Sequence, residues 1–163
     1  MHLPFYLLLL VVIIIFQTTI LNIVAIAGVT PDLVMLLVVL SGFLLGTREG
    51  AFLGFIGGIV EDLFSGCYIG INALSKMAAG YLAGAAGDRL YRENIPIATG
   101  VTFFTSLAGL IVNYLLLLYL KIHVSPLYAF LRVALPTAAY TAVLAPFIFR
   151  RIFRYIQLRG RDL

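Results

Sequence analysis

Long apolar stretches, separated by short polar breaks, run through almost the whole chain. Six stretches can be marked, at roughly residues 3–27, 32–47, 50–65, 69–87, 96–120 and 126–150. None shows the alternation of polar and apolar residues that is typical of a transmembrane β-strand. Because a spanning helix needs about 20 mostly apolar residues, the pattern predicts an all-α, polytopic membrane protein with six transmembrane helices in one domain, residues 1–163.

Four stretches need separate comment. The first begins Met1-His-Leu-Pro without basic residues, so we expect a retained helix and not a cleaved signal peptide. Segments 32–47 and 50–65 are short, which indicates tilted or re-entrant helices, or a locally thinned bilayer. Pro136 and Pro146 lie inside the last segment and are expected to kink or break it.

Composition narrows the possible functions. Hydrophobic residues make up 63% of the chain, charged residues 11%, and the mean hydropathy is +1.10. These values exclude a soluble globular domain, because so much apolar surface cannot be hidden in a core of this size. The breaks between segments are too short for a catalytic or nucleotide-binding domain.

Basic residues fix the expected orientation. With six spans, one side of the membrane carries a group of arginines: Arg48, Arg89, Arg92, Arg150, Arg151, Arg154, Arg159 and Arg161. The other side carries only Lys121 as a basic loop residue. The positive-inside rule therefore predicts that both termini are cytoplasmic. Residues 151–163 are expected to form a basic cytoplasmic tail that contacts membrane lipids, and no nucleic-acid binding is expected.

Five charged residues fall within the predicted spans or at their edges. Asp32, Glu61, Asp62, Lys76 and Arg132 all fall in the outer half of the membrane by their positions along the segments. Such charges are costly in lipid and usually have a use. Two interpretations remain open: a polar outward-facing cavity or partner-docking site, and a set of ion pairs that fix helix packing.

Small residues predict which helices pack together. At 100° per residue, Glu61 is centred on a glycine face of the third segment, with Asp62 on its flank. The glycines of that face are Gly50, Gly54, Gly57 and Gly58. One face of the fourth segment carries Asn72, Ala73, Lys76, Gly80, Ala83, Gly84 and Gly87. Because small residues let helices approach closely in lipid, we expect these two segments to pack together and Lys76 to pair with Glu61.

The remaining polar residues do not form a recognisable catalytic set. Gln17, Asn22 and Asn113 are expected to make interhelical hydrogen bonds. His2 and His123 have no neighbours at metal-ligand spacing, and no glycine-rich phosphate loop is present. The sequence therefore predicts no catalytic residues, no metal and no cofactor. A membrane enzyme that uses Glu61 and Asp62 as acid and base is disfavoured, because adjacent helical residues diverge by about 100°.

The tract from Gly54 to Leu74 resembles the signature region of the MreD family of bacterial rod shape-determining membrane proteins. The matching residues are Asp62, Leu63, Ser65, Gly66, Gly70, Ala73 and Leu74. Pro31-Asp32 and the basic C-terminal end also fit. Glu61 and Lys76 are not matched to the family pattern, so their roles rest on periodicity alone.

The resemblance implies a non-enzymatic scaffold of the cell-wall elongation complex in the inner membrane. Its direct partner would be the bitopic protein MreC, received in a lipid-facing groove near the small-residue faces. RodA, a class B transpeptidase and MreB would belong to the same complex. The family also resembles the six-helix substrate-binding subunits of energy-coupling-factor transporters, so the alternative is a substrate-binding subunit of a small-molecule transporter.

Two sets of residues are thus predicted to matter. The expected pocket or partner site comprises Asp32, Glu61, Asp62, Asn72, Lys76 and Arg132. The expected helix-packing glycines are Gly54, Gly57, Gly58, Gly66, Gly70, Gly80 and Gly84.

Overall fold

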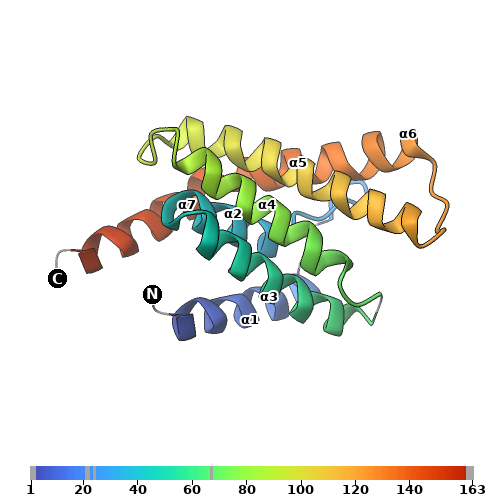
Figure 1. The fold of residues 1–163 in the computed structure, drawn as a ribbon, viewed down its shortest axis with the longest axis horizontal. Helices are drawn as coiled ribbons and strands as arrows, with labels where there is room; N and C mark the ends of the chain where they lie inside the picture. Colours follow the sequence, from blue (N-terminus) through green and yellow to red (C-terminus); the bar gives the residue numbers. More distant parts are fainter. Residues whose placement is uncertain (1–2, 21–22, 24, 67, 161–163) are drawn as a thin grey trace.

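A computed structural model describes residues 3–20, 23, 25–66 and 68–160, and these are mostly helical (Figure 1). The helices are α1 (Leu3–Ile20), α2 (Leu33–Leu45), α3 (Thr47–Ser65), α4 (Ile71–Gly87), α5 (Ile95–Tyr119), α6 (Pro126–Tyr128), η1 (Ala129–Ala134) and α7 (Leu135–Gly160). The last three run on without a break, and η1 is a π-helical stretch within them. Each predicted apolar segment contains one long helix.

Two helix ends differ clearly from the prediction. α1 ends at Ile20 and not near residue 27, and a tight turn follows in which Ile26 and Val29 exchange backbone hydrogen bonds. α7 continues to Gly160, so residues 151–160 of the expected tail are helical. The helix continues because Phe149 and Ile152 are buried in the core at helical spacing while Arg150 and Arg151 stay exposed.

α2 is the central helix of the bundle. It contacts α1, α3, α4, α5 and α7, and its residues from Val34 to Leu44 are all buried. Its sequence is apolar on every face, which is typical of a helix surrounded by protein. α2 has 13 residues and is about 20 Å long, whereas α5 has 25 residues and is about 37 Å long. The short second segment is therefore short because it lies inside the protein.

Glycines bring α2, α3 and α4 into close contact. α3 and α4 share the most extensive interface in the molecule, as their small-residue faces predict. A Cβ at Gly54 or Gly58 of α3 would overlap the α4 backbone, and one at Gly80 or Gly84 would overlap the α3 backbone. Gly57 faces the other way and meets Leu10 of α1 and Val34 of α2.

Gly66 and Gly70 are not packing glycines, which corrects the prediction. A Cβ at either position would meet no atom within 4 Å. Their φ angles are +63° and +109°, so they end α3 and precede α4 in left-handed conformations. Glycine adopts this region without the steric cost that a Cβ imposes.

Gly54→Ala is expected to lower the thermal midpoint of the detergent-solubilised protein, because the added methyl group must push α4 away. Overpacking of this kind costs about 1–3 kcal/mol. Gly100→Ala is the matched control, since a Cβ there meets nothing within 4 Å and alanine favours a helix. Equal midpoints for the two variants would contradict the close packing of α3 on α4.

The predicted interruption of the last helix occurs at Pro136 and not at Pro146. Leu135 N donates to the carbonyl oxygen of Phe130, five residues earlier, and this wider turn lies directly before Pro136. In a regular α-helix the proline ring at 136 would collide with the carbonyl of Arg132. The π-helical turn relieves that collision, while the α-helix continues through Pro146.

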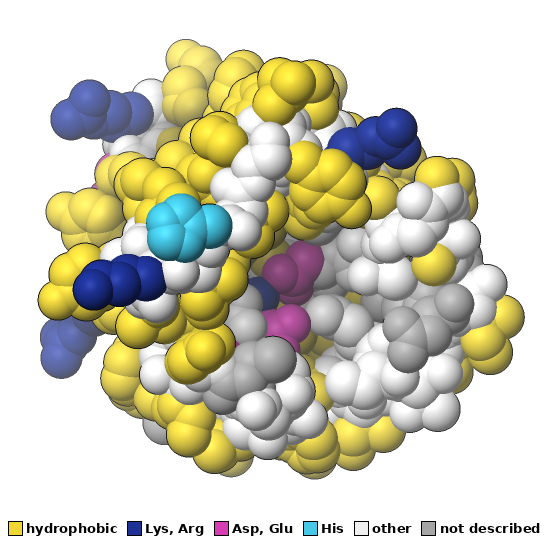
Figure 2. Space-filling model, turned by 90° about the vertical axis from the view of Figure 1, so that its right-hand side faces the viewer, with side chains coloured by type: hydrophobic (Ala, Val, Ile, Leu, Met, Phe, Trp, Pro, Cys, Tyr) yellow, Lys and Arg dark blue, Asp and Glu magenta, His cyan; other side chains and the backbone are white. Residues whose placement is uncertain are grey.

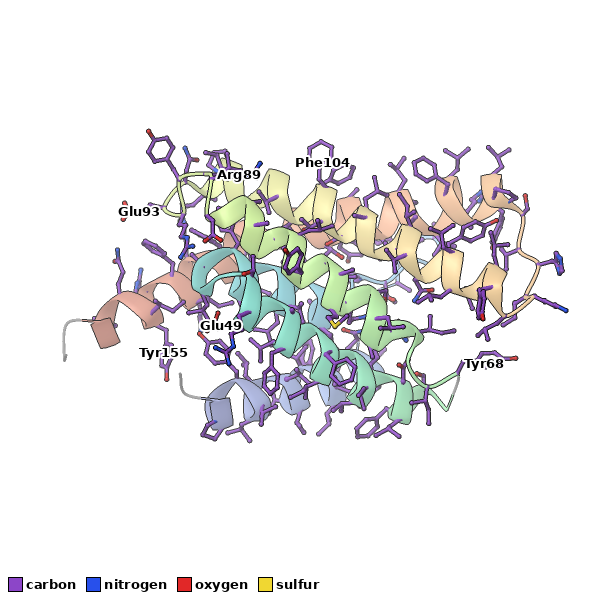
Figure 3. All side chains as sticks on the ribbon, in the orientation of Figure 1. Glu49, Tyr68, Arg89, Glu93, Phe104 and Tyr155 are labelled. Carbon is purple, nitrogen blue, oxygen red and sulfur yellow. The ribbon has the colours of Figure 1, made fainter. Side chains whose placement is uncertain are left out.

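The helices connect at two ends of the elongated bundle. α1 begins and α7 ends at one end, where Glu49, Arg89 and Tyr155 also lie, and Tyr68 lies at the opposite end (Figure 3). We call these the arginine end and the Tyr68 end. Of the described helices, α5 and the continuous helix Pro126–Leu158 are long and apolar enough to cross a membrane. Tyr6–Ile20 and Leu33–Leu45 are apolar but shorter.

Candidate functional site

A buried lysine joins three helices near the Tyr68 end. Lys76 of α4 is 2% exposed, and its Nζ lies 2.8 Å from Asp32 Oδ2 and 2.5 Å from Glu61 Oε2. Asp32 caps α2, and Glu61 lies near the end of α3. The predicted pair of Lys76 and Glu61 is therefore present, but as part of a triad with Asp32 that periodicity did not indicate. We call these three residues the lysine triad.

Gln17 attaches α1 to the triad. Its Nε2 donates to Glu61 Oε1 at 3.2 Å, and its Oε1 accepts from the backbone N of Leu33 at 2.9 Å. Asp32 Oδ1 accepts from Met35 N, which completes the cap of α2. These bonds satisfy backbone donors that helix geometry leaves free at the start of α2. Gln17 was expected to make an interhelical hydrogen bond, and it makes several.

Asp62 performs a capping role across two helices. The N-cap residue of α4 is Gly70, which has no side chain, and the carboxylate of Asp62 on α3 takes its place. It accepts from the backbone N of Gly70 at 2.8 Å, and of Asn72 and Ala73 at 3.3 Å. Asn72 Nδ2 adds a fourth bond at 2.9 Å. A negative charge there also complements the positive end of the helix dipole.

Asp62 lies on the buried face of α3 and not on its flank, which corrects the sequence interpretation. Asp62 is 1% exposed and continues the stripe of Gly54 and Gly58 that packs on α4. Glu61 continues a second stripe through Gly57 that faces α1 and α2. A projection at 100° per residue placed these two stripes on one face. In the structure α3 contacts different neighbours along each stripe.

A polar cavity of about 420 Å³ opens above the start of α2. Its lining includes Gln17, Asp32, Glu61, Arg132 and Thr137. Acidic side chains lie at the bottom of a hollow in the Tyr68 end, with a basic side chain beside them (Figure 2). The segment before α2 forms part of its wall, since residues 27–32 belong to the lining. We call it the outer cavity.

Arg132 lines the outer cavity but does not join the triad. It lies in η1 and its side chain is exposed. Within the described ranges, the ion pairs are Lys76–Asp32, Lys76–Glu61 and Arg92–Asp88, so Arg132 has no carboxylate partner there. Asn72 does not line the outer cavity. Its Oδ1 accepts a hydrogen bond from Asn113 of α5 at 3.2 Å. Asn22 falls outside the described residues.

The arrangement gives Glu61 and Asp62 separate partners. Glu61 and Asp62 bond to different helices, so they do not converge on one point. Among the side chains that the structure describes, no group of three or more His, Cys, Asp or Glu is placed to hold a metal ion. Sequence reasoning missed Thr141, which accepts from the backbone N of Asp32 at 3.1 Å. An isolated threonine in an apolar helix gives no signal of that contact.

Comparison with known families decides the identity. The family model described as rod shape-determining protein MreD matches residues 1–159. The chain belongs to the MreD family. It is therefore a rod shape-determining membrane protein, and the MreD family is not a known family of enzymes. No curated protein and no solved structure matches the chain.

The residues that carry the MreD resemblance build the α3–α4 hairpin. Asp62 caps α4, Gly66 and Gly70 supply the two left-handed positions of the connection, and Ala73 packs beneath Gly58. In this chain the signature tract thus specifies how two helices join and approach each other.

Proposed function

We propose that this MreD-family protein is a non-enzymatic scaffold of the wall-elongation complex. It would cross the inner membrane six times, with the arginine end in the cytoplasm, and bind MreC by helix packing. RodA, the class B transpeptidase and MreB would join through that contact. The observation that carries the proposal is that the signature tract and the lysine triad, with Gln17, hold α1, α2, α3 and α4 in one arrangement, which is what a rigid docking partner requires.

The proposed MreC-binding surface differs from the lipid-facing groove that the sequence predicted. The small-residue faces of α3 and α4 are packed against each other and offer no lipid-facing groove. An apolar hollow of about 490 Å³ lies instead between α5 and the α6–η1 segment. Its lining includes Leu110, Leu117, Ala129 and Phe130. We propose that the transmembrane helix of MreC packs here, where α5 presents its long apolar surface.

Ala129→Trp is expected to abolish recovery of MreC, because the indole fills the hollow. The measurement is a tagged pull-down from membranes in mild detergent, with co-purified proteins identified by mass spectrometry. Ala139→Trp is the matched control, since Ala139 is an exposed alanine of the same continuous helix outside the hollow. Both variants are first checked for the wild-type thermal midpoint.

The pull-down separates the possible outcomes. Recovery of a bitopic MreC-like protein with wall synthases by the wild type and Ala139→Trp, and its loss with Ala129→Trp, supports the scaffold and its surface. Recovery of MreC by the wild type and by both variants rejects the hollow as the docking surface. Recovery of ATP-hydrolysing subunits in place of MreC rejects the scaffold and assigns the chain to a transporter.

A further inference from the structure

The outer cavity presents charges of opposite sign on different walls. Asp32 and Glu61 line it with side chains that are 15% and 19% exposed, while Lys76 beneath them is 2% exposed. Two carboxylates against one ammonium give the triad a formal net charge of −1. Arg132 enters from η1 and has no carboxylate partner among the described residues. An occupant that matches this cavity carries both an amine and an anion.

A second hollow adjoins the outer cavity, on the side where α1 and α7 are not packed closely. No Cα atom of α1 lies within 8 Å of one in α7 along the described residues. This hollow of about 390 Å³ shares Arg132, Ala27 and Val29 with the outer cavity and adds Pro136 and Tyr140. The outer cavity therefore adjoins a hollow between the turn at residues 26–29 and the start of α7.

Nearer the arginine end, α1 and α7 border a separate space, which we call the α1–α7 seam and which shares no lining residue with these two hollows. The seam has a volume of about 510 Å³, with Leu37 of α2 in its lining. Ile13 borders it on α1, and Phe147 and Ile148 border it on α7. An occupant that extends from the outer cavity into the α1–α7 seam needs a charged head and a long apolar tail.

We propose that the outer cavity and the α1–α7 seam bind one phosphatidylethanolamine molecule of the outer leaflet. The phosphate lies at Arg132, whose planar guanidinium suits phosphate oxygens. The ammonium lies at Glu61 and Asp32, whose carboxylates accept its N–H groups. One acyl chain follows the seam past Phe147. The inference depends on the proposed outward orientation of the cavity but not on the binding of MreC.

Lipid selectivity tests the proposal on the purified protein alone. Native mass spectrometry from mild detergent compares retention of added dioleoyl phosphatidylethanolamine, phosphatidylcholine and phosphatidylglycerol. Phosphatidylethanolamine is expected to be retained about tenfold more strongly than phosphatidylcholine, because a quaternary ammonium cannot donate to the carboxylates. Phosphatidylglycerol is expected to bind more weakly still, since it brings no cation to the acids.

Two variants and two controls locate the site. Arg132→Gln is expected to reduce retention of phosphatidylethanolamine about tenfold, and because the Arg132 side chain is exposed, the change removes no buried contact. Glu61→Gln removes the selectivity over phosphatidylcholine. Lys121→Gln and Glu93→Gln, which change exposed charges outside the cavity, leave retention unchanged.

Three results would overturn the proposal. One is equal retention of phosphatidylethanolamine and phosphatidylcholine by the wild type, and another is unchanged retention in Arg132→Gln. The third is retention of free phosphoethanolamine as strong as that of the lipid, which would mean that a soluble zwitterion is the ligand. Loss of MreC in the pull-down leaves all three measurements unaffected, so the two proposals fail separately.

Discussion

Lys76→Met is expected to destabilise the protein by about 3–5 kcal/mol, the usual cost of leaving a buried ion pair without one partner. The methionine keeps most of the side-chain volume but removes the ammonium that joins Asp32 and Glu61. Two carboxylates would then face each other beneath the outer cavity. The measurement is the free energy of unfolding in detergent, with Lys121→Met as the control at an exposed lysine.

Neutralising the whole triad distinguishes electrostatics from packing. The triple variant Asp32→Asn, Glu61→Gln and Lys76→Met is expected to recover most of the lost stability, because no charge is left buried. If the triple variant is as unstable as Lys76→Met, lost packing and not unpaired charge is the cause. The double variant Glu61→Lys with Lys76→Glu is expected to regain only part of the lost stability, because the acid placed at position 76 would face Asp32.

Asp62→Ala is expected to cost about 3 kcal/mol, because several buried donors at the start of α4 lose their acceptor. These donors are the backbone N–H groups of Gly70, Asn72 and Ala73 and the side-chain amide of Asn72. Amide hydrogen exchange over residues 70–74 should accelerate, and the thermal midpoint should fall. Cells that carry this variant are expected to lose their rod shape, since the α3–α4 hairpin underlies the proposed scaffold.

Asp88→Ala is the control for this prediction. Asp88 is a half-exposed acid at the other end of α4, where it pairs with Arg92. Surface pairs of this kind contribute about 0–1 kcal/mol, so stability and exchange should change little. Unchanged exchange at residues 70–74 in Asp62→Ala would show that the cap does not hold the first turn of α4.

The triad and the Asp62 cap suggest why the chain tolerates charges in an apolar bundle. Lys76, Glu61 and Asp32 connect α4, α3 and the start of α2, and Gln17 adds α1. Lipid offers little hydrophobic driving force between helices, so polar contacts and close glycine packing can select one arrangement. In this protein the selected arrangement leaves a cavity above α2 and exposes the apolar surface of α5.

The amino-acid sequence alone predicts the helical class, the approximate positions of the six long helices and the pairing of α3 with α4. These features depend on apolar run length and on local spacing, which are properties of adjacent residues. The sequence also indicated that Lys76 meets Glu61, because both lie on small-residue faces. The family resemblance was carried by residues 54–74, and the match over residues 1–159 confirms it.

The folded structure was needed to show that α2 is central, that Asp32 joins Lys76 and that Asp62 caps α4. Each of these depends on which neighbours surround a helix, and one chain's periodicity does not contain that information. Asp62 and Glu61 are adjacent in sequence, yet they bond to different helices because α3 packs on two sides. The outer cavity likewise forms only where several elements meet, since α1, α3, α5, η1 and the segment before α2 all contribute to its lining.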